Sequence, residues 1–451
     1  MGEGGAPSAK RLKTAQADAN EVITFHFLDA HKEATEIIEA SSFPPDMCHQ
    51  FFGDEEEIKG YEDLAVDIWL SQKSYQALLE VRCTSRTPHA DDIEKTLRDK
   101  FTAGLSVTRS AYLRKLLMTP PLNMESLGKA VLERKLDSGS LSVHRIQLST
   151  ADQTVRDLHA RMEPLLMFFV DGASAIDTKE PEWDLLLAVH REGHITTIAG
   201  FATIYNFWCF PHRVRIRVSQ VLVLPPNQGK GMGSALLEAV YHTADERHAV
   251  DITYEDPTDV VQMMREKIEL QRALKVEWLV QLAKRTAQEM STKAGPSNGN
   301  SSEAHGAEAT TAALTLDQAR AQADLRVSKQ QVRKLWEVLL YGQTGWEEAQ
   351  REAAVEGLVR ARLVGSVTST KRVAEGKRIF DLPGGGFCMT KVPNQSGVGH
   401  GAGMPVAMES TEAEGESAEE REAALNEAVS KRMQEIAHLV TWCSDKLGVK
   451  F

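Results

Sequence analysis

The chain has 451 residues, of which 42% are hydrophobic and 26% are charged, and its formal net charge at pH 7 is -12. This length exceeds what a single hydrophobic core usually holds, so two or three domains are expected. The acidic balance argues against direct binding to nucleic acid and is compatible with a basic partner.

The ends and the cysteines predict a compartment. No apolar run approaches membrane-spanning length, and the polar start lacks the apolar core of a signal peptide, so no membrane anchor is expected. Five scattered cysteines argue against a disulfide framework and against a zinc cluster, which indicates a reducing compartment and no metal. The basic residues Lys10, Arg11 and Lys13 are compatible with a nuclear import signal or with a solvated tail.

The first 150 residues predict a flexible start over 1–20 and then an α+β domain over 21–150. Alternating and apolar runs predict strands at 22–28, 64–70, 75–81 and 141–148, with a helix at 91–100. A loop at 49–61 carries four consecutive carboxylates from Asp54 to Glu57. Four like charges repel each other, so this loop needs either open solvent or a cationic ligand.

The central third predicts a mixed α/β domain over 151–258. Its elements are an amphipathic helix at 152–169, a hairpin of strands 185–189 and 195–205 around a turn at 191–194, a strand at 216–224 buried on both faces, a helix after 233, and a strand at 250–254.

The last third predicts helices and linkers. A helical extension is expected over 259–292, a flexible linker over 293–312, and a helical region over 313–451 with a disordered stretch near 394–420. Its apolar stripes are typical of core packing or of partner docking.

The strand at 216–224 runs into Gln228-Gly229-Lys230-Gly231-Met232-Gly233 and then into a helix. A helix start exposes unpaired backbone N–H groups, which attract phosphate. The spacing fits neither a Walker loop nor the dinucleotide fingerprint. The alternative is a glycine-rich turn without a ligand, which we disfavour because three glycines at a helix start lower stability.

This Q-x-x-G-x-G pattern resembles the acyl-coenzyme A pyrophosphate loop of the GNAT superfamily of N-acetyltransferases. Further motifs resemble one family within it, the catalytic subunit of type B histone acetyltransferases. They are the segments 49–55, 60–61, 171–177, 205–207, 217–220 and 251–257, together with Trp183. The resemblance spans roughly residues 20 to 290 and fades beyond the linker.

The resemblance implies acetyl-coenzyme A as co-substrate and lysines in the tail of newly made histone four as acceptors. It places coenzyme contacts on Val221, Leu222, Val223, Gln228, Gly229, Lys230, Gly231, Met232, Gly233 and Ser234. It places histone contacts on Asp54, Glu55, Glu56, Trp183, Tyr205, Asn206 and Phe207. It further implies a WD-repeat histone-binding partner and a location in nucleus and cytoplasm.

The same resemblance makes Glu255 the general base, with Asp256 and Asp171 as auxiliary carboxylates, although the family often has Glu where this chain has Asp171. A lysine amine, with a free pKa of about 10.4, attacks a thioester only when neutral, so a carboxylate must take its proton. The other interpretation of Glu255 is a solvent-facing acid or a helix cap.

Two other functions remain open at this point. One is a GNAT enzyme that acetylates another protein or a small amine, for which the acidic loop has no use. The other is a catalytically silent histone-binding scaffold, for which Glu255 and the glycine loop have no use.

Overall fold

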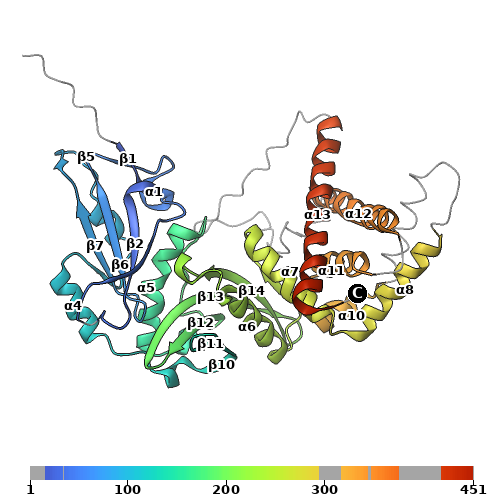
Figure 1. Cartoon of the computed structure of the whole chain (residues 1–451), viewed down its shortest axis with the longest axis horizontal. Helices are drawn as coiled ribbons and strands as arrows, with labels where there is room; N and C mark the ends of the chain where they lie inside the picture. Colours follow the sequence, from blue (N-terminus) through green and yellow to red (C-terminus); the bar gives the residue numbers. More distant parts are fainter. Residues whose placement is uncertain (1–15, 34, 294–315, 344–346, 375–417, 450–451) are drawn as a thin grey trace, which may run out of the picture. The chain divides into compact units, whose positions relative to one another are not determined.

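A computed structural model of the chain describes residues 16–33, 35–293, 316–343, 347–374 and 418–449. The chain divides into two units, residues 1–248 and residues 249–451. The first unit contains both β-sheets described below, and the second is mostly helical (Figure 1).

The first unit begins with a five-stranded mixed sheet in the order β3-β2-β6-β7-β9. Its strands are β2 (Ile23–Leu28), β3 (Glu39–Phe43), β6 (Ala65–Leu70), β7 (Ala77–Arg82) and β9 (Leu105–Ser106). β2 pairs with β6, and β7 with β9, in parallel, whereas the other neighbours are antiparallel. The predicted strands at 22–28, 64–70 and 75–81 are confirmed.

Short elements surround this sheet. They are α2 (His49–Phe52), α3 (Ile93–Arg98), α4 (Arg109–Met118), and the two-stranded pair β5 (Tyr61–Glu62) and β8 (Ser85–Arg86). Residues 16–20, which we expected to be flexible, are ordered. β1 (Gln16–Asp18) pairs with β4 (Glu57–Lys59), and α1 (Ala19–Val22) follows it. Residues 1–15 lie outside the described part.

A second sheet follows within the first unit, with antiparallel neighbours in the order β10-β11-β12-β13-β14. The strands are β10 (Lys129–Lys135), β11 (Ser140–Gln147), β12 (Trp183–Glu192), β13 (Ile195–Cys209) and β14 (Arg213–Leu222). Gly193, at a φ of 57°, makes the predicted turn between β12 and β13. Helix α6 (Met232–Glu246) packs against this sheet.

Helix α5 (Gln153–Phe169) lies between the two sheets of the first unit (Figure 1). Its side chains Val155, Leu158, Met162 and Leu165 are all at most 2% exposed. They belong to one hydrophobic cluster that takes in residues of β2, β6 and β7 on one side and of β12, β13 and β14 on the other. Burial of apolar surface therefore joins the two sheets through α5.

One prediction about the central strand is wrong. We expected both faces of the strand at 216–224 to be buried, but burial alternates along β14: Ile216, Val218 and Leu222 are at most 4% exposed, whereas Val221 is half-buried. Neighbouring side chains of a strand point to opposite faces, so one face of β14 packs on the core and the other stays partly open.

The second unit contains β15 (Ile252–Tyr254) and helices in place of the longer helical runs that we expected. These are α7 (Asp259–Ala273), α8 (Glu277–Lys293), α10 (Gln318–Leu325), α11 (Lys329–Tyr341), α12 (Glu348–Ala374) and α13 (Ala418–Leu447). The linker expected at 293–312 lies outside the described residues except for Lys293, and so does the stretch at 394–420 except for 418–420, which open α13. None of the described helices combines the length and the apolar character that a membrane crossing requires.

A buried ionic network ties α13 to the other helices of the second unit. Arg432 on α13, with a side chain 5% exposed, donates to Glu266 on α7 at 2.6 Å and to Glu337 on α11 at 3.3 Å. Lys334 lies 3.3 Å from Glu266, and Arg362 on α12 donates to Glu337 at 2.5 Å. Each buried charge thus has an opposite partner, which is the condition for burying charges at acceptable cost.

These pairings shift the pKa of Glu266. Burial by itself would raise this pKa, but the charges of Arg432 and Lys334 and the hydrogen bonds to the carboxylate lower it from 4.5 to about 2. Because the folded-state pKa is lower than the unfolded one, the ionised carboxylate contributes stability above pH 4.5, and this contribution is lost as the pH falls through about 2.

We expect Arg432→Met to lower the free energy of unfolding by about 3–5 kcal/mol at pH 7, because it leaves two buried carboxylates without their shared partner. Urea unfolding followed by circular dichroism measures this. The matched control is Arg360→Met, which removes a partner of the exposed Glu422 and should cost only about 0.2–1 kcal/mol. The difference between wild type and Arg432→Met should narrow as the pH is lowered from 4.5. Equal losses in the two variants at pH 7 would contradict the role given to Arg432.

Candidate functional site

The glycine-rich turn leads from β14 into α6 and leaves the start of that helix open. Gly231 is the N-cap residue at a φ of 80°, and no side chain caps the helix. The first hydrogen bond along the helix runs from Ala235 N–H to the Gly231 carbonyl at 3.0 Å. The N–H groups of residues 232–234 precede this bond, so they point out of the helix end, where the helix dipole favours an anion.

Two side-chain amides of the turn itself stabilise its conformation. The amide of Gln228 donates to the Val223 carbonyl at 2.8 Å, and that of Asn227 donates to the Ala199 carbonyl at 3.3 Å. Gly229, Lys230 and Gly231 remain exposed. Gln228 therefore shapes the turn with its side chain, so any contact that it makes to a ligand comes from its backbone.

The predicted coenzyme residues on and after β14 divide by face. Val221 and Val223 are half-buried, whereas Leu222 is 4% exposed and packs in the core. Gly200 allows this end of β14 to approach β13, because a Cβ there would lie 2.6 Å from the Leu222 carbonyl oxygen. Of the three residues, only Val221 and Val223 present side chains to a ligand on the open face.

Arg134 is a candidate residue that the sequence interpretation missed. It lies on β10, donates to Glu238 of α6 at 2.7 Å, and places Nη1 3.7 Å from the position of a Cβ on Gly231. A cation beside the helix start strengthens the attraction for phosphate. We predicted no strand at 129–135, and the sequence contains no local signal that joins Arg134 to the turn.

The four carboxylates of the loop are not equivalent. Glu56, at a φ of 53°, accepts hydrogen bonds from the N–H groups of Cys48 at 2.5 Å and His49 at 2.8 Å, and from Asn20 at 2.6 Å. Burial alone would raise its pKa, but these hydrogen bonds lower it. Glu56 thus holds the start of α2, whereas Asp54 and Glu55 are exposed.

His49 links this loop to Asp171, which the sequence interpretation did not anticipate. Its Nε2 lies 3.2 Å from a carboxylate oxygen of Asp171, and its Nδ1 lies 3.8 Å from Glu56. The Asp171 side chain is 79% exposed. The structure therefore brings Asp171 to the acidic loop, among the residues predicted to bind the histone.

The predicted aromatic residues form a cluster on β12 and β13. The rings of Trp183 and Tyr205 meet edge to face at 4.8 Å, and those of Tyr205 and Phe207 lie 4.6 Å apart. The guanidinium of Arg217 lies 4.7 Å from the Phe207 ring centre. All three aromatic residues are half-buried, and Trp183 also packs against the hydrophobic core, so each presents only part of its ring to the surface. Such a surface suits the aliphatic stem of a lysine.

Asn206 does not belong to this cluster. Its side chain donates to the Glu182 carbonyl at 2.7 Å and to the Asp184 carboxylate at 3.1 Å. Arg247 donates to Asn206 and lies 2.6 Å from Asp184. Since neighbouring residues of a strand face opposite ways, Asn206 braces the sheet from the face opposite to Tyr205 and Phe207.

The segment 171–177 is held by two buried polar groups. Gln220 on β14 donates to the Ser174 carbonyl at 2.8 Å and accepts from Thr203 at 2.9 Å. Glu163 on α5 accepts from the Ile176 N–H at 2.8 Å, and burial raises its pKa. Gln220 and the segment were both among the motifs of the family resemblance, and their hydrogen bond accounts for their joint occurrence.

Glu255 and Asp256 lie in the second unit, immediately after β15. Both are exposed, and Asp256 has a φ of 35°. The cap of α7 is Thr258, which accepts a hydrogen bond from Val261 N–H at 3.3 Å. Glu255 is therefore not the helix cap, and one of its structural alternatives is removed.

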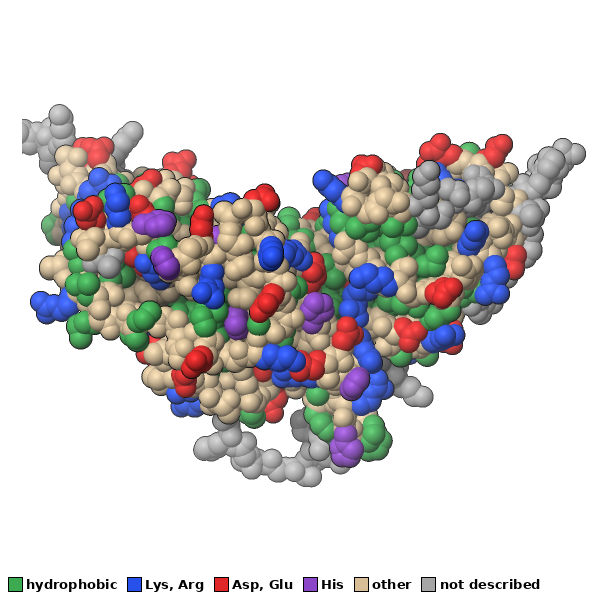
Figure 2. Space-filling model, turned by 60° about the horizontal axis from the view of Figure 1, so that its bottom comes forward, with side chains coloured by type: hydrophobic (Ala, Val, Ile, Leu, Met, Phe, Trp, Pro, Cys, Tyr) green, Lys and Arg blue, Asp and Glu red, His purple; other side chains and the backbone are tan. Residues whose placement is uncertain are grey.

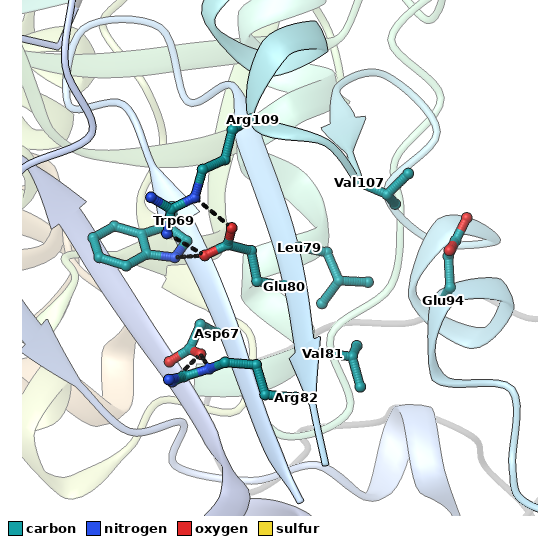
Figure 3. A pocket seen from close by; sticks show the side chains of 9 residues that line it. All are labelled: Asp67, Trp69, Leu79, Glu80, Val81, Arg82, Glu94, Val107 and Arg109. Atoms are coloured by element: carbon teal, nitrogen blue, oxygen red, sulfur yellow. Dashed lines mark hydrogen bonds and ion pairs between the residues drawn. The ribbon is translucent and has the colours of Figure 1, made fainter. Parts of the chain in front are cut away.

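A cavity of about 510 Å³ lies elsewhere, on the N-terminal sheet (Figure 3). Four of its five charged residues are paired with each other, Arg82 with Asp67 at 2.6 Å and Arg109 with Glu80 at 2.6 Å. The fifth, Glu94, pairs with Arg98 at 2.5 Å. Trp69 also donates to Glu80. This cavity thus offers no unpaired acid or base for transfer chemistry. Among the described residues, no group of His, Cys, Asp and Glu is arranged to hold a metal ion.

Two segments of the chain are similar to known protein families. Residues 15–171 match the family described as "Histone acetyl transferase HAT1 N-terminus", and residues 154–261 match the "Acetyltransferase (GNAT) family". Proteins named histone acetyltransferase type B catalytic subunit are similar over most of the chain. The one from Arabidopsis thaliana is 26% identical over 81% of this chain and 80% of its own length. The one from Zea mays is 26% identical over 82% and 79%.

The relative from Mus musculus is 30% identical over 48% of this chain and 55% of its own length. The chain is thus similar to type B catalytic subunits, and its GNAT segment matches a family model of its own. It is accordingly an acyltransferase that uses acetyl-coenzyme A, the co-substrate of GNAT enzymes. The open start of α6 fits the pyrophosphate of such a co-substrate, because it offers N–H donors without a competing cap.

We expect Gly231→Val to abolish binding of acetyl-coenzyme A, and Gly233→Val to do the same, because a branched side chain would cover the N–H groups at the start of α6. Isothermal titration calorimetry is the direct measurement. Gly172→Val is the matched control for Gly231→Val: Gly172 also has a positive φ, of 66°, and has no atom near its Cβ position. It should keep wild-type affinity. Wild-type affinity in both α6 variants would remove the coenzyme from this turn.

Proposed function

We propose that this protein acetylates lysines in the N-terminal tail of newly made, free histone four by direct transfer from acetyl-coenzyme A. The observation that carries the proposal is the uncapped glycine-rich start of α6 beside the open face of β14. It supports a co-substrate with a pyrophosphate, and the similarity to type B catalytic subunits over four fifths of the chain supports a histone acceptor.

In the proposed reaction, Glu255 takes a proton from the lysine ammonium, and the neutral amine attacks the thioester carbonyl. The acetyl group passes from sulfur to nitrogen, and the coenzyme leaves as a thiol after taking up a proton. No covalent enzyme intermediate is needed. The family resemblance and the position of Glu255 just after β15 support this role.

The acceptor tail is basic, and the first unit has groups that suit it. Asp54, Glu55 and Asp171 supply exposed carboxylates. The aromatic cluster supplies a half-buried surface for the aliphatic stem of the lysine. Burial raises the pKa of the Tyr205 hydroxyl, and the carboxylates of Glu180 and Glu182 raise it further, so Tyr205 stays neutral there. Acidic and basic side chains are interspersed over the face seen in Figure 2, so these individual groups, rather than a broad acidic patch on that face, support recognition.

A WD-repeat histone-binding partner and action in both nucleus and cytoplasm are further parts of the proposal. They rest on the family resemblance. A small-amine acetyltransferase is the second candidate, and the exposed Asp54 and Glu55 weigh against it because a small amine needs no remote acidic loop.

We expect Glu255→Gln to keep coenzyme affinity and to lower the transfer rate by about 10²-fold or more at pH 7, since a positioned base contributes about that much. The rate should recover partly at high pH, where more of the lysine is already neutral. Steady-state kinetics with a histone tail peptide and calorimetry with acetyl-coenzyme A measure the two quantities. Asp256→Asn is the matched control, with an expected loss well below that of Glu255→Gln. An unchanged rate in Glu255→Gln would assign the base to Asp256, Asp171 or water.

We expect the double variant Asp54→Asn/Glu55→Gln to raise the KM for a histone tail peptide several-fold and to leave kcat nearly unchanged, because exposed charges bind ground and transition states alike. An ion pair between one of these exposed carboxylates and a basic side chain of the peptide contributes about 0.2–1 kcal/mol and is screened by salt. The increase in KM should therefore become smaller as the salt concentration is raised.

The separate variant Glu56→Gln tests the division of roles within the loop. It should lower stability, because it weakens the hydrogen bonds that hold α2. A small-amine acceptor should not respond to the double variant. If the peptide KM of the double variant were unaltered at low and at moderate salt, the loop would be a solvated turn.

A further inference from the structure

A second cavity, of about 450 Å³, lies between α4 and the N-terminal half of α5, away from every residue assigned above. Arg161 of α5 lines it and is only 9% exposed. Its Nε donates to the Ser74 carbonyl at 2.6 Å, and no carboxylate of the described residues pairs with it. The Arg161 guanidinium is thus buried with a single neutral hydrogen-bond partner.

A buried cation without an opposite charge is unfavourable unless something compensates it. Burial accordingly lowers the pKa of Arg161, and Asp157 opposes this only in part. The Asp157 carboxylate is engaged by Gln153 at 2.6 Å. Arg161 therefore has further N–H groups beside the cavity that have no acceptor among the described residues.

Two lysines add to the positive charge of the same cavity. Lys115 of α4 is exposed and donates to the Leu105 carbonyl at 3.4 Å. Lys73 lies 3.6 Å from Glu33. The cavity is lined by three cations and one carboxylate, and Glu33 beside Lys73 adds a second carboxylate, which leaves a balance of +1. Like charges gathered around one cavity favour a bound anion.

The backbone is shaped to bring these groups together. A Cβ on Gly104 would lie 2.9 Å from the Arg161 side chain and 3.2 Å from Gln76 Oε1, so only glycine admits both. Gln76 is 7% exposed and lines the cavity; its amide nitrogen donates to Thr119 at 3.0 Å, whereas its Oε1 has no partner among the described residues.

We propose that this cavity binds a phosphate monoester, with the phosphate held by Arg161 and Lys115 and an apolar substituent placed on Met118 and Leu122. A phosphate offers three terminal oxygens to the N–H groups of Arg161 and Lys115, and its negative charge suits the positive balance of the cavity. Met118 is 75% exposed and Leu122 also lines the cavity, so an apolar surface borders the cationic floor. The volume is within the range of small-molecule sites.

Phenyl phosphate is the test ligand, titrated calorimetrically into the full chain. Saturable binding is expected, at least tenfold weaker in Lys115→Met and lost in Arg161→Met, with circular dichroism verifying that the fold is retained. Arg114→Met is the matched control, since Arg114 is an exposed neighbour on α4 that does not line the cavity. It should bind as the wild type does.

Two further titrations distinguish this cavity from the coenzyme turn and a phosphate from a carboxylate. Gly231→Val should bind phenyl phosphate normally, because the coenzyme turn is not involved. Benzoate should bind more weakly than phenyl phosphate, because its carboxylate offers two oxygens to the cations and a phosphate offers three. The proposal is overturned by an absence of saturable binding, by equal weakening in Arg114→Met and Lys115→Met, by loss of binding in Gly231→Val, or by tighter binding of benzoate.

Discussion

The C-terminal end of α5 is the constraint on which the first unit depends. The Phe168 carbonyl accepts hydrogen bonds from the N–H groups of Asp46 and Met47, which lie just before the acidic loop, at 3.0 and 3.1 Å. The Phe168 ring stacks on Phe51 at 4.0 Å. A helix end must satisfy its free carbonyls, and here a distant loop does so. The acidic loop and the second sheet are thereby built on one helix.

This arrangement explains why residues of the same type differ in role. Glu56 accepts hydrogen bonds from the N–H groups of Cys48 and His49, so it stabilises the loop on which Asp54 and Glu55 are exposed. Neighbouring residues of β13 also differ in role: Tyr205 belongs to the aromatic cluster on one face of the sheet, and Asn206 forms hydrogen bonds that stabilise the sheet on the other face. Position on a strand or turn, rather than residue type, decides which groups face solvent.

Local patterns were sufficient to predict the elements on which we propose the coenzyme site. The strand, the glycine turn and the helix after it are contiguous in sequence, and α5 follows from its apolar periodicity. Contacts between distant segments left no local signal: Arg134 reaches the start of α6 from β10, and His49 pairs with Asp171. The expected two-sided burial of β14 was wrong because apolar composition does not tell a core face from a ligand face.

The stability of α6 depends on its apolar packing and not on a side-chain cap at its N-terminus. Gly231 at the N-cap, in place of a capping Ser, Thr, Asp or Asn, lowers the stability of α6 by about a few tenths of a kcal/mol. The helix persists because Leu236, Val240 and Tyr241 are at most 1% exposed beneath it, and burying such a side chain contributes about 1.5–3 kcal/mol. Apolar packing on one face of α6 therefore allows its N-terminus to keep donors free for an anionic ligand, and a bound pyrophosphate would supply the cap that the sequence omits.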